Sequence, residues 1–264
     1  MKKTLAKLCA LLIDLDGVLW VGQQPLPGVH AFFQFLRARD LRFILVSNNS
    51  TRRAAYTVER MQRMGVDIAP ADVLTTAEAT PRWLRAHAPQ LQRVLVIGET
   101  ALRDALTQAQ FEIVERDADA VIVGLDRQVN YEKLKRATLE LRRGARFIAT
   151  NTDRTLPTEE GLTPGAGALV AALVAATDLE PLVIGKPGRP LFELALDLAK
   201  TPIQETAMLG DRLDTDIDGA AALGLTTIMV LTGVSTRAQA AQNKHQPDFI
   251  FENLDALRQA WAIA

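Results

Sequence analysis

Short apolar segments alternate with longer amphipathic segments along most of the chain. The apolar segments are hydrophobic at consecutive positions, which is typical of parallel strands that are covered on both faces. Several amphipathic segments begin with proline or a capping residue and end at a glycine, as Gly65 and Gly144 illustrate. The predicted strands are residues 9–15, 42–47, 93–97, 120–125, 146–150, 182–184, 206–209 and 226–231, and the clearest predicted helices are residues 29–39, 52–64, 131–143 and 191–200.

The repeated order of strand and helix predicts an α/β fold with a doubly wound, mostly parallel sheet. The polar motifs at strand ends fall before residue 50 and after residue 182, and the ends of the middle strands lack the same phosphate-site character. We therefore expect a Rossmann-like core domain that is split by a smaller inserted α/β domain. The expected parts are residues 1–77 and 182–264 for the core and residues 78–181 for the insertion.

Two aspartates end the first predicted strand. Asp14 and Asp16 lie two residues apart, so their carboxylates point to the same side of an extended chain. Gly17 then allows the backbone to turn sharply. Like charges held so close need a cation, and an oxygen-only ligand set suits Mg²⁺. A solvated loop after a strand is the alternative interpretation of this motif.

Hydroxyl, amide and lysine side chains follow two further strands. The segment 47–51, which includes Ser47 and Asn48, offers donors that suit an anion, although the same residue types also cap helices. Lys186 directly follows a buried strand and is framed by Gly185 and Pro187, so it is held on a stiff turn. Each of these motifs is weak evidence when taken alone.

A second acidic cluster follows the strand predicted at residues 206–209. Asp211 is nearest the strand end and is the better metal ligand, whereas Asp214 is better explained as a cap of the next helix. Asp216 lies two residues further on. The chain thus carries four motifs in order: an acid pair, a hydroxyl group, a lysine and a second acid pair. Each lies at the carboxyl end of a predicted parallel strand, so the four would converge on the ligand crevice of an open α/β sheet.

In this order the motifs resemble those of the haloacid dehalogenase superfamily, in the branch of NagD-type and 4-nitrophenylphosphatase-like enzymes. The resemblance covers nearly the whole chain. The matching segments are 14–20 (DLDGVLW), 47–50 (SNNS), 149–153 (ATNTD), 185–187 (GKP) and 210–217 (GDRLDTDI).

The resemblance implies hydrolysis of a phosphate ester through a covalent aspartyl phosphate. Asp14 would be the nucleophile, and Asp16 would protonate the leaving oxygen and then accept a proton from water. Mg²⁺ would be bound by Asp14, the backbone carbonyl of Asp16 and Asp211. Asp216 would orient metal-bound water from outside the ligand shell.

The same resemblance implies that Ser47, the backbone N–H of Asn48 and Lys186 bind the phosphate oxygens. Relatives that displace halide lack the second acid, so the presence of Asp16 favours phosphoryl transfer. The inserted domain would be a cap of the larger type that covers the site.

The substrate would be a small phosphorylated metabolite, and the cap would select it. Asn151, Asp153 and Arg154 follow a predicted cap strand and are the candidate substrate contacts, although a polar turn explains them equally well. The resemblance also implies a homodimer formed through the cap.

Three other functions fit the residues less well. A phospho-acceptor signalling module would be about half this length and would carry its acceptor on a middle strand. A catalytically silent binding protein would not need the full set of catalytic residues. A dinucleotide site at residues 165–167 lacks the third glycine and a directly preceding strand.

Composition excludes several other classes. The chain has 264 residues, with 30 Lys and Arg against 31 Asp and Glu, so its net charge of −1 gives no bulk attraction to nucleic acid. The single Cys9 excludes an internal disulfide. Lys7 and Asp14 interrupt the N-terminal apolar stretch, and residues 166–176 are too few to span a bilayer. We therefore expect a cytoplasmic protein with no membrane or nucleic-acid partner.

Overall fold

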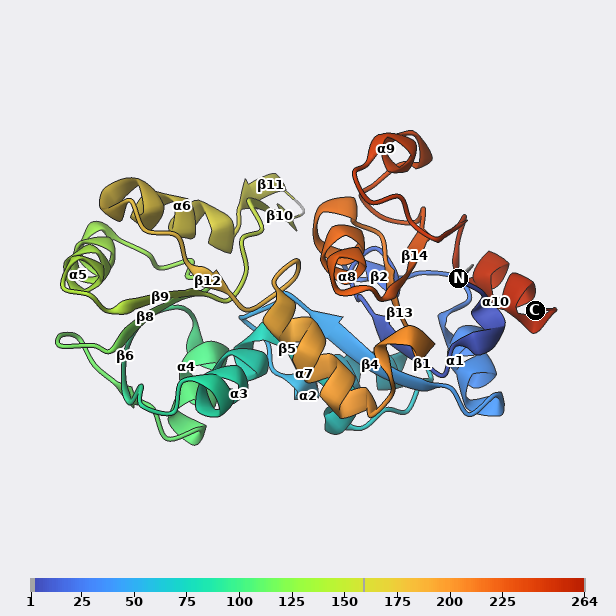
Figure 1. Ribbon diagram of the computed structural model, residues 1–264, viewed down its shortest axis with the longest axis horizontal. Coiled ribbons are helices and arrows are strands. Elements are labelled where there is room, and N and C mark those ends of the chain that lie inside the picture. Colours follow the sequence, from blue (N-terminus) through green and yellow to red (C-terminus); the bar gives the residue numbers. More distant parts are fainter. Residues whose placement is uncertain (1–2, 159, 264) are drawn as a thin grey trace. The chain divides into compact units, whose positions relative to one another are not determined.

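The computed structural model describes residues 3–158 and 160–263 (Figure 1). The described residues form two compact units. The first takes its residues from 1–47, 55–74 and 192–264, and the second from 48–54 and 75–191.

A six-stranded sheet is the centre of the first unit, and its strand order is β15-β14-β13-β1-β4-β5. The pairings among β1, β4, β13, β14 and β15 are all parallel. Every residue of β1 is buried, as expected for a strand covered on both faces. The strands are β1 (Ala10–Ile13), β4 (Arg42–Ser47), β5 (Val73–Thr75), β13 (Thr206–Gly210), β14 (Thr226–Val230) and β15 (Phe249–Phe251).

Helices connect these strands, and a small antiparallel hairpin follows β1. The hairpin pairs β2 (Trp20–Val21) with β3 (Gln24–Pro25). The helices are α1 (Val29–Ala38), α2 (Ala54–Arg63), α7 (Arg189–Ala199), α8 (Asp218–Leu223), α9 (Arg237–Gln242) and α10 (Leu254–Ala262), with short 3-10 turns at Leu5–Lys7, Pro70–Asp72 and Ile203–Glu205 and a π turn at Leu213–Ile217.

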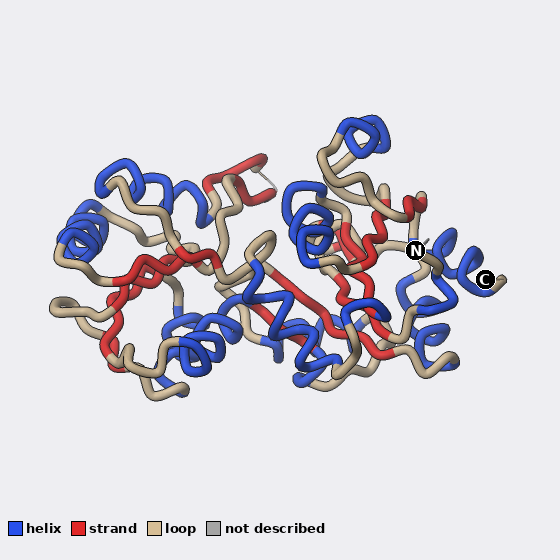
Figure 2. Tube along the Cα trace, viewed as in Figure 1, coloured by secondary structure: helices blue, strands red, loops and turns tan. Residues whose placement is uncertain are grey.

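The second unit has its own five-stranded sheet, in the order β12-β9-β8-β6-β7, and all its pairings are parallel. Helices α5 and α6 lie on one face, and α3 and α4 lie on the other (Figures 1 and 2). Its elements are α3 (Thr76–His87), β6 (Arg93–Ile97), α4 (Thr100–Gln108), β7 (Glu112–Ile113), β8 (Ala120–Val123), α5 (Tyr131–Arg142), β9 (Arg146–Ala149), the hairpin β10 (Thr155–Thr158) and β11 (Gly161–Pro164), α6 (Ala166–Thr177) and β12 (Leu182–Val183).

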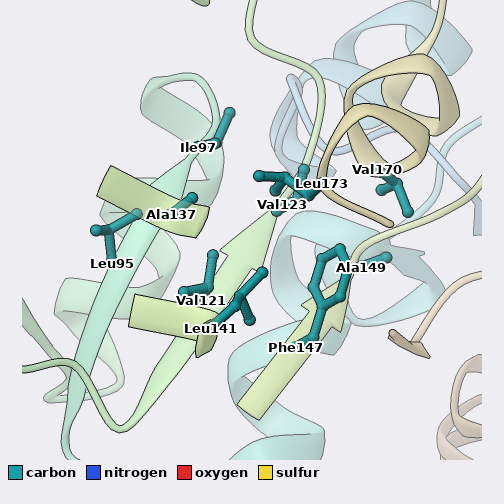
Figure 3. Packing of buried hydrophobic residues seen from close by; sticks show 10 residues of the cluster. All are labelled: Leu95, Ile97, Val121, Val123, Ala137, Leu141, Phe147, Ala149, Val170 and Leu173. Atoms are coloured by element: carbon teal, nitrogen blue, oxygen red, sulfur yellow. The ribbon is translucent and has the colours of Figure 1, made fainter. Parts of the chain in front are cut away.

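A hydrophobic core fixes α5 and α6 to this sheet (Figure 3). Val121 and Val123 of β8 are fully buried beneath Ala137 of α5 and Leu173 of α6. The second unit therefore has a core of its own and can act as a rigid support for the polar residues at its strand ends.

The predicted fold class is confirmed: both sheets are parallel, and the smaller α/β unit is inserted in the chain of the larger one. The sequence prediction lacks β2, β3, β5, β7, β10, β11 and β15. Five of these strands have only two or three residues, so they carry little hydrophobic pattern. The domain limits at residues 78 and 181 stay a prediction, since compact units describe packing and not the limits of an inserted sequence. In the described part of the chain, no helix is long and apolar enough to cross a membrane.

Candidate active site

Three carboxylates meet at the carboxyl ends of neighbouring strands in the first unit. Strands β1 and β13 are paired with Ile13 opposite Leu209, so Asp14 and Asp211 leave the sheet side by side. Asp216 comes from the π turn after β13. One carboxylate oxygen from each of the three aspartates lies within 4.8 Å of the others. The sheet therefore gathers three negative charges in a small volume.

Backbone N–H groups hold two of these carboxylates in place. Oδ2 of Asp211 accepts a hydrogen bond of 2.6 Å from the backbone N–H of Val234. Oδ2 of Asp216 accepts hydrogen bonds from the N–H groups of Asp211 (3.2 Å) and Arg212 (3.1 Å). Asp211 and Asp216 are fully buried, so these bonds replace part of the hydration that each carboxylate loses.

Glycines allow the backbone to approach the buried carboxylates. A Cβ atom at Gly17 or at Gly233 would lie well within the van der Waals contact distance of Asp211 Oδ2. Gly17 also has φ of +85°, in the left-handed region that favours glycine. The turn that follows Asp16 can therefore fold directly over Asp211.

Asp16 and Ser47 belong to the same unit. The side chain of Asp16 is exposed, and its Oδ1 accepts a hydrogen bond of 2.9 Å from Nε1 of Trp20. Ser47 is buried at the carboxyl end of β4, the strand that pairs with β1 on the side opposite β13.

The other predicted residues meet in the second unit, around Asn48. The side chain of Asn48 donates to the backbone carbonyl of Lys186 (2.9 Å) and accepts from its N–H (2.8 Å). Asn151 donates to the carbonyl of Asn48 (2.7 Å), and Asp153 accepts from Asn48 Nδ2 at 3.2 Å. Arg154 lies beside this group in sequence, and its side chain is exposed.

A separate cavity of about 840 Å³ lies within the second unit. Ion pairs between Glu99 and Arg127 (2.7 Å) and between Asp126 and Lys133 (2.7 Å) line it. Among the described residues, the lining includes none of the predicted site residues.

The first unit's acidic cluster has the chemistry of a magnesium site. Three carboxylates offer hard oxygen ligands, and the set contains no nitrogen or sulfur donor. Like charges packed this closely favour a bound cation that neutralises them. Asp14, Asp211 and Asp216 therefore fit a divalent metal of this class.

The comparisons with known proteins agree with this geometry. Residues 11–112 match the family of haloacid dehalogenase-like hydrolases, and residues 183–257 match the HAD-hydrolase-like family. The chain is 37% identical over 245 residues to an acid sugar phosphatase of Staphylococcus haemolyticus, which covers 92% of this chain and 93% of that protein. The chain belongs to the haloacid dehalogenase-like hydrolases.

Solved structures of this hydrolase family resemble the whole chain. A p-nitrophenyl phosphatase from Archaeoglobus fulgidus superposes with a TM-score of 0.90 at 34% identity, covering 96% of this chain and 98% of that one. A glycerol phosphate phosphatase from Mycobacterium tuberculosis, solved with magnesium, gives 0.88 at 36% identity and covers 99% and 80%. These relatives confirm the predicted NagD/4-nitrophenylphosphatase-like branch and the predicted enzyme class, a phosphoric monoester hydrolase.

The sequence did not predict two contacts of this hydrolase, the bond from the Val234 N–H to Asp211 and the bond from Trp20 to Asp16. The loop of residues 232–235 follows the predicted strand at 226–231. Its position at the carboxyl end of a strand is therefore a signal that could have indicated it. Its contribution to Asp211 is a backbone N–H, however, which any residue carries. Trp20 belongs to the first motif, but the residue types alone do not predict its hydrogen bond to Asp16.

Proposed function

We propose that this protein hydrolyses small phosphate monoesters through an aspartyl phosphate on Asp14. The observation that carries the proposal is the convergence of Asp14, Asp211 and Asp216 within 4.8 Å at adjacent strand ends. The family membership of nearly the whole chain supports it.

In the first step, a carboxylate oxygen of Asp14 attacks the phosphorus atom, and the bond between phosphorus and the ester oxygen breaks. Asp16 gives its proton to that leaving oxygen, so the alcohol departs neutral. The phosphoryl group remains on Asp14 as a mixed anhydride. The position of Asp16, two residues beyond Asp14 on the turn after β1, suits this role.

In the second step, water attacks the phosphorus atom of the aspartyl phosphate and gives a proton to Asp16. The bond between phosphorus and the Asp14 oxygen breaks, which releases inorganic phosphate and regenerates the carboxylate. Asp16 is then protonated again for the next cycle. The two displacements divide one difficult hydrolysis into two easier reactions.

Magnesium would be held by Asp14, the backbone carbonyl of Asp16 and Asp211, and it would supply positive charge that offsets the phosphate and the carboxylates. Asp216 would orient water at the metal. Its Oδ2 accepts two backbone hydrogen bonds, which would hold this carboxylate in a fixed orientation towards that water.

Ser47, the backbone N–H of Asn48 and Lys186 would bind the phosphate oxygens. Asn48 follows Ser47 directly in the chain. The side chain of Asn48 forms two hydrogen bonds with the backbone of Lys186. These contacts support a linked role for the three residues, in which Lys186 supplies a point charge to the phosphate.

The substrate would be a small sugar phosphate or glycerol phosphate, since relatives carry the names acid sugar phosphatase and glycerol phosphate phosphatase. Asn151, Asp153 and Arg154 would contact its organic part. A homodimer formed through the second unit belongs to the same proposal, and sedimentation of the full chain tests it.

The decisive experiment compares Asp14→Asn with Asp214→Asn, using Mg²⁺ and a panel of phosphate monoesters. Asp214 is an exposed aspartate that is paired with Arg212 at 2.9 Å, so it is a matched control. We expect Asp14→Asn to abolish turnover without unfolding the protein and Asp214→Asn to retain it. Turnover at the wild-type rate in pure Asp14→Asn would overturn the proposal. A single stoichiometric labelling of the wild type without turnover would instead indicate a signalling module.

A further inference from the structure

A tryptophan reaches back from the β2–β3 hairpin to the proposed general acid. Trp20 is 3% exposed, and its Nε1 lies 2.9 Å from Oδ1 of Asp16. The backbone N–H of Gly17 donates to the carbonyl of Trp20 at 2.7 Å, which closes the turn between the two residues. The contact is therefore built by a tight local fold.

An arginine from a different element holds the tryptophan. The guanidinium carbon of Arg60, on α2, lies 3.9 Å from the centroid of the Trp20 ring. Its Nη2 donates to the backbone carbonyl of Gly22, which joins β2 to β3. Arg60 thus contacts both the indole face and the hairpin that carries it, a favourable cation–π arrangement.

We propose that Trp20 is a positioning residue that fixes the carboxyl group of Asp16 for proton transfer, with Arg60 as its support. The proposal rests on the proposed function of Asp16 as general acid and base. An exposed aspartate on a turn can occupy several rotamers, and proton transfer requires one of them. The hydrogen bond from the indole selects that rotamer before the substrate binds.

The chemistry of the indole also distinguishes the two carboxyl oxygens. Indole N–H is a donor only, so Oδ1 of Asp16 must act as an acceptor towards Trp20. This bond favours the transferable proton on Oδ2.

Isosteric replacement isolates the N–H group. Benzothienylalanine has the shape of tryptophan with sulfur in place of the indole N–H, and it is introduced at position 20 of the full chain. The matched control is the same replacement at Trp83, whose Nε1 is buried and has no hydrogen-bond partner among the described residues. The control separates loss of an N–H group in general from loss of the Asp16 contact.

The readout is kcat/KM for 4-nitrophenyl phosphate and for glycerol phosphate, because this ratio reports formation of the aspartyl phosphate. Nitrophenolate leaves as a stable anion, whereas an alkoxide needs a proton. At position 20 we expect about a tenfold greater loss for glycerol phosphate than for the aryl ester. For Arg60→Gln we expect the loss of kcat/KM to be about two- to fivefold greater for glycerol phosphate than for the aryl ester. Equal losses for both esters, or no loss at position 20, would overturn the proposal.

A measurement without turnover tests the contact itself. In ¹H–¹⁵N spectra we expect Asp16→Ala to move the Trp20 indole N–H resonance and to leave that of Trp83 in place. A Trp20 resonance that does not respond would overturn the proposed contact. If the resonance responds but Asp16→Ala still hydrolyses glycerol phosphate normally, the proposed role of Asp16 fails, and the positioning role fails with it.

Discussion

The backbone N–H of Val234 donates to Oδ2 of Asp211 at 2.6 Å, although the two residues are 23 positions apart. The loop that carries Val234 follows β14, the strand paired with β13, so both residues leave the same edge of the sheet. Thr232 of this loop also donates through Oγ1 to the carbonyl of Gly17 at 2.6 Å. The loop therefore connects the two turns that carry the acidic cluster.

Substitution of Gly233 should weaken magnesium binding. In Gly233→Ala the new Cβ would overlap Oδ2 of Asp211, so the carboxylate or the loop must move. We expect at least about a tenfold loss of Mg²⁺ affinity in calorimetric titration, since a shifted ligand forfeits the geometry that Mg²⁺ requires. Val234→Ala is the control, because it keeps the backbone N–H and changes only an exposed side chain. Equal affinities in all three proteins would show that the loop does not position Asp211.

Removal of the metal should abolish hydrolysis and lower the free energy of unfolding. EDTA should suppress hydrolysis, and added Mg²⁺ should restore it. Because a ligand that binds only the folded state stabilises it, Mg²⁺ at 100 times its Kd should add about 2.7 kcal/mol to the free energy of unfolding. Thermal unfolding with and without Mg²⁺ measures this effect, which Asp211→Asn should largely remove. Hydrolysis that persists through chelation would contradict the metal site.

Much of the fold and part of the candidate site were readable from residue order. Consecutive apolar positions predict the central strands. Polar residues at the carboxyl ends of predicted strands indicate Asp14, Ser47 and Asp211, which the first unit places at the ends of neighbouring strands. Short edge strands were missed, since their pattern is too brief. The contacts of Val234 and Trp20 were also missed. They depend on a backbone N–H and on how a hairpin folds back, and neither leaves a mark in the residue types.

Two asparagines of the second unit, Asn48 and Asn130, should respond differently to conversion into aspartate. Asn48 donates from Nδ2 to the carbonyl of Lys186 and to Asp153, so Asn48→Asp loses both bonds and places a second carboxylate beside Asp153. We expect it to lower the free energy of unfolding by about 1–3 kcal/mol, as for unsatisfied buried groups. Asn130→Asp is the control, because Asn130 is exposed and its Oδ1 accepts a hydrogen bond from the backbone N–H of Lys133 (3.0 Å), a role that aspartate preserves. Urea unfolding compares the two variants, and an equal response would refute the network around Asn48.

The stability of the second unit should depend on the ionisation of Asp119. The backbone N–H groups of Arg93 and Gln92 both donate to its Oδ2 at 2.8 Å, and they hold the pKa of this carboxyl below its usual value. A carboxyl whose pKa is lower in the folded state stabilises the fold above its unfolded pKa, about 3.9, and loses that contribution as the pH falls through the folded value. Asp119→Asn should therefore be less stable than the wild type at pH 7, and the difference should shrink below about pH 4. Urea unfolding at both pH values measures it, with Asp117→Asn as a nearby exposed control. A difference that stays constant across the pH range would show that the charge of Asp119 contributes nothing to folding.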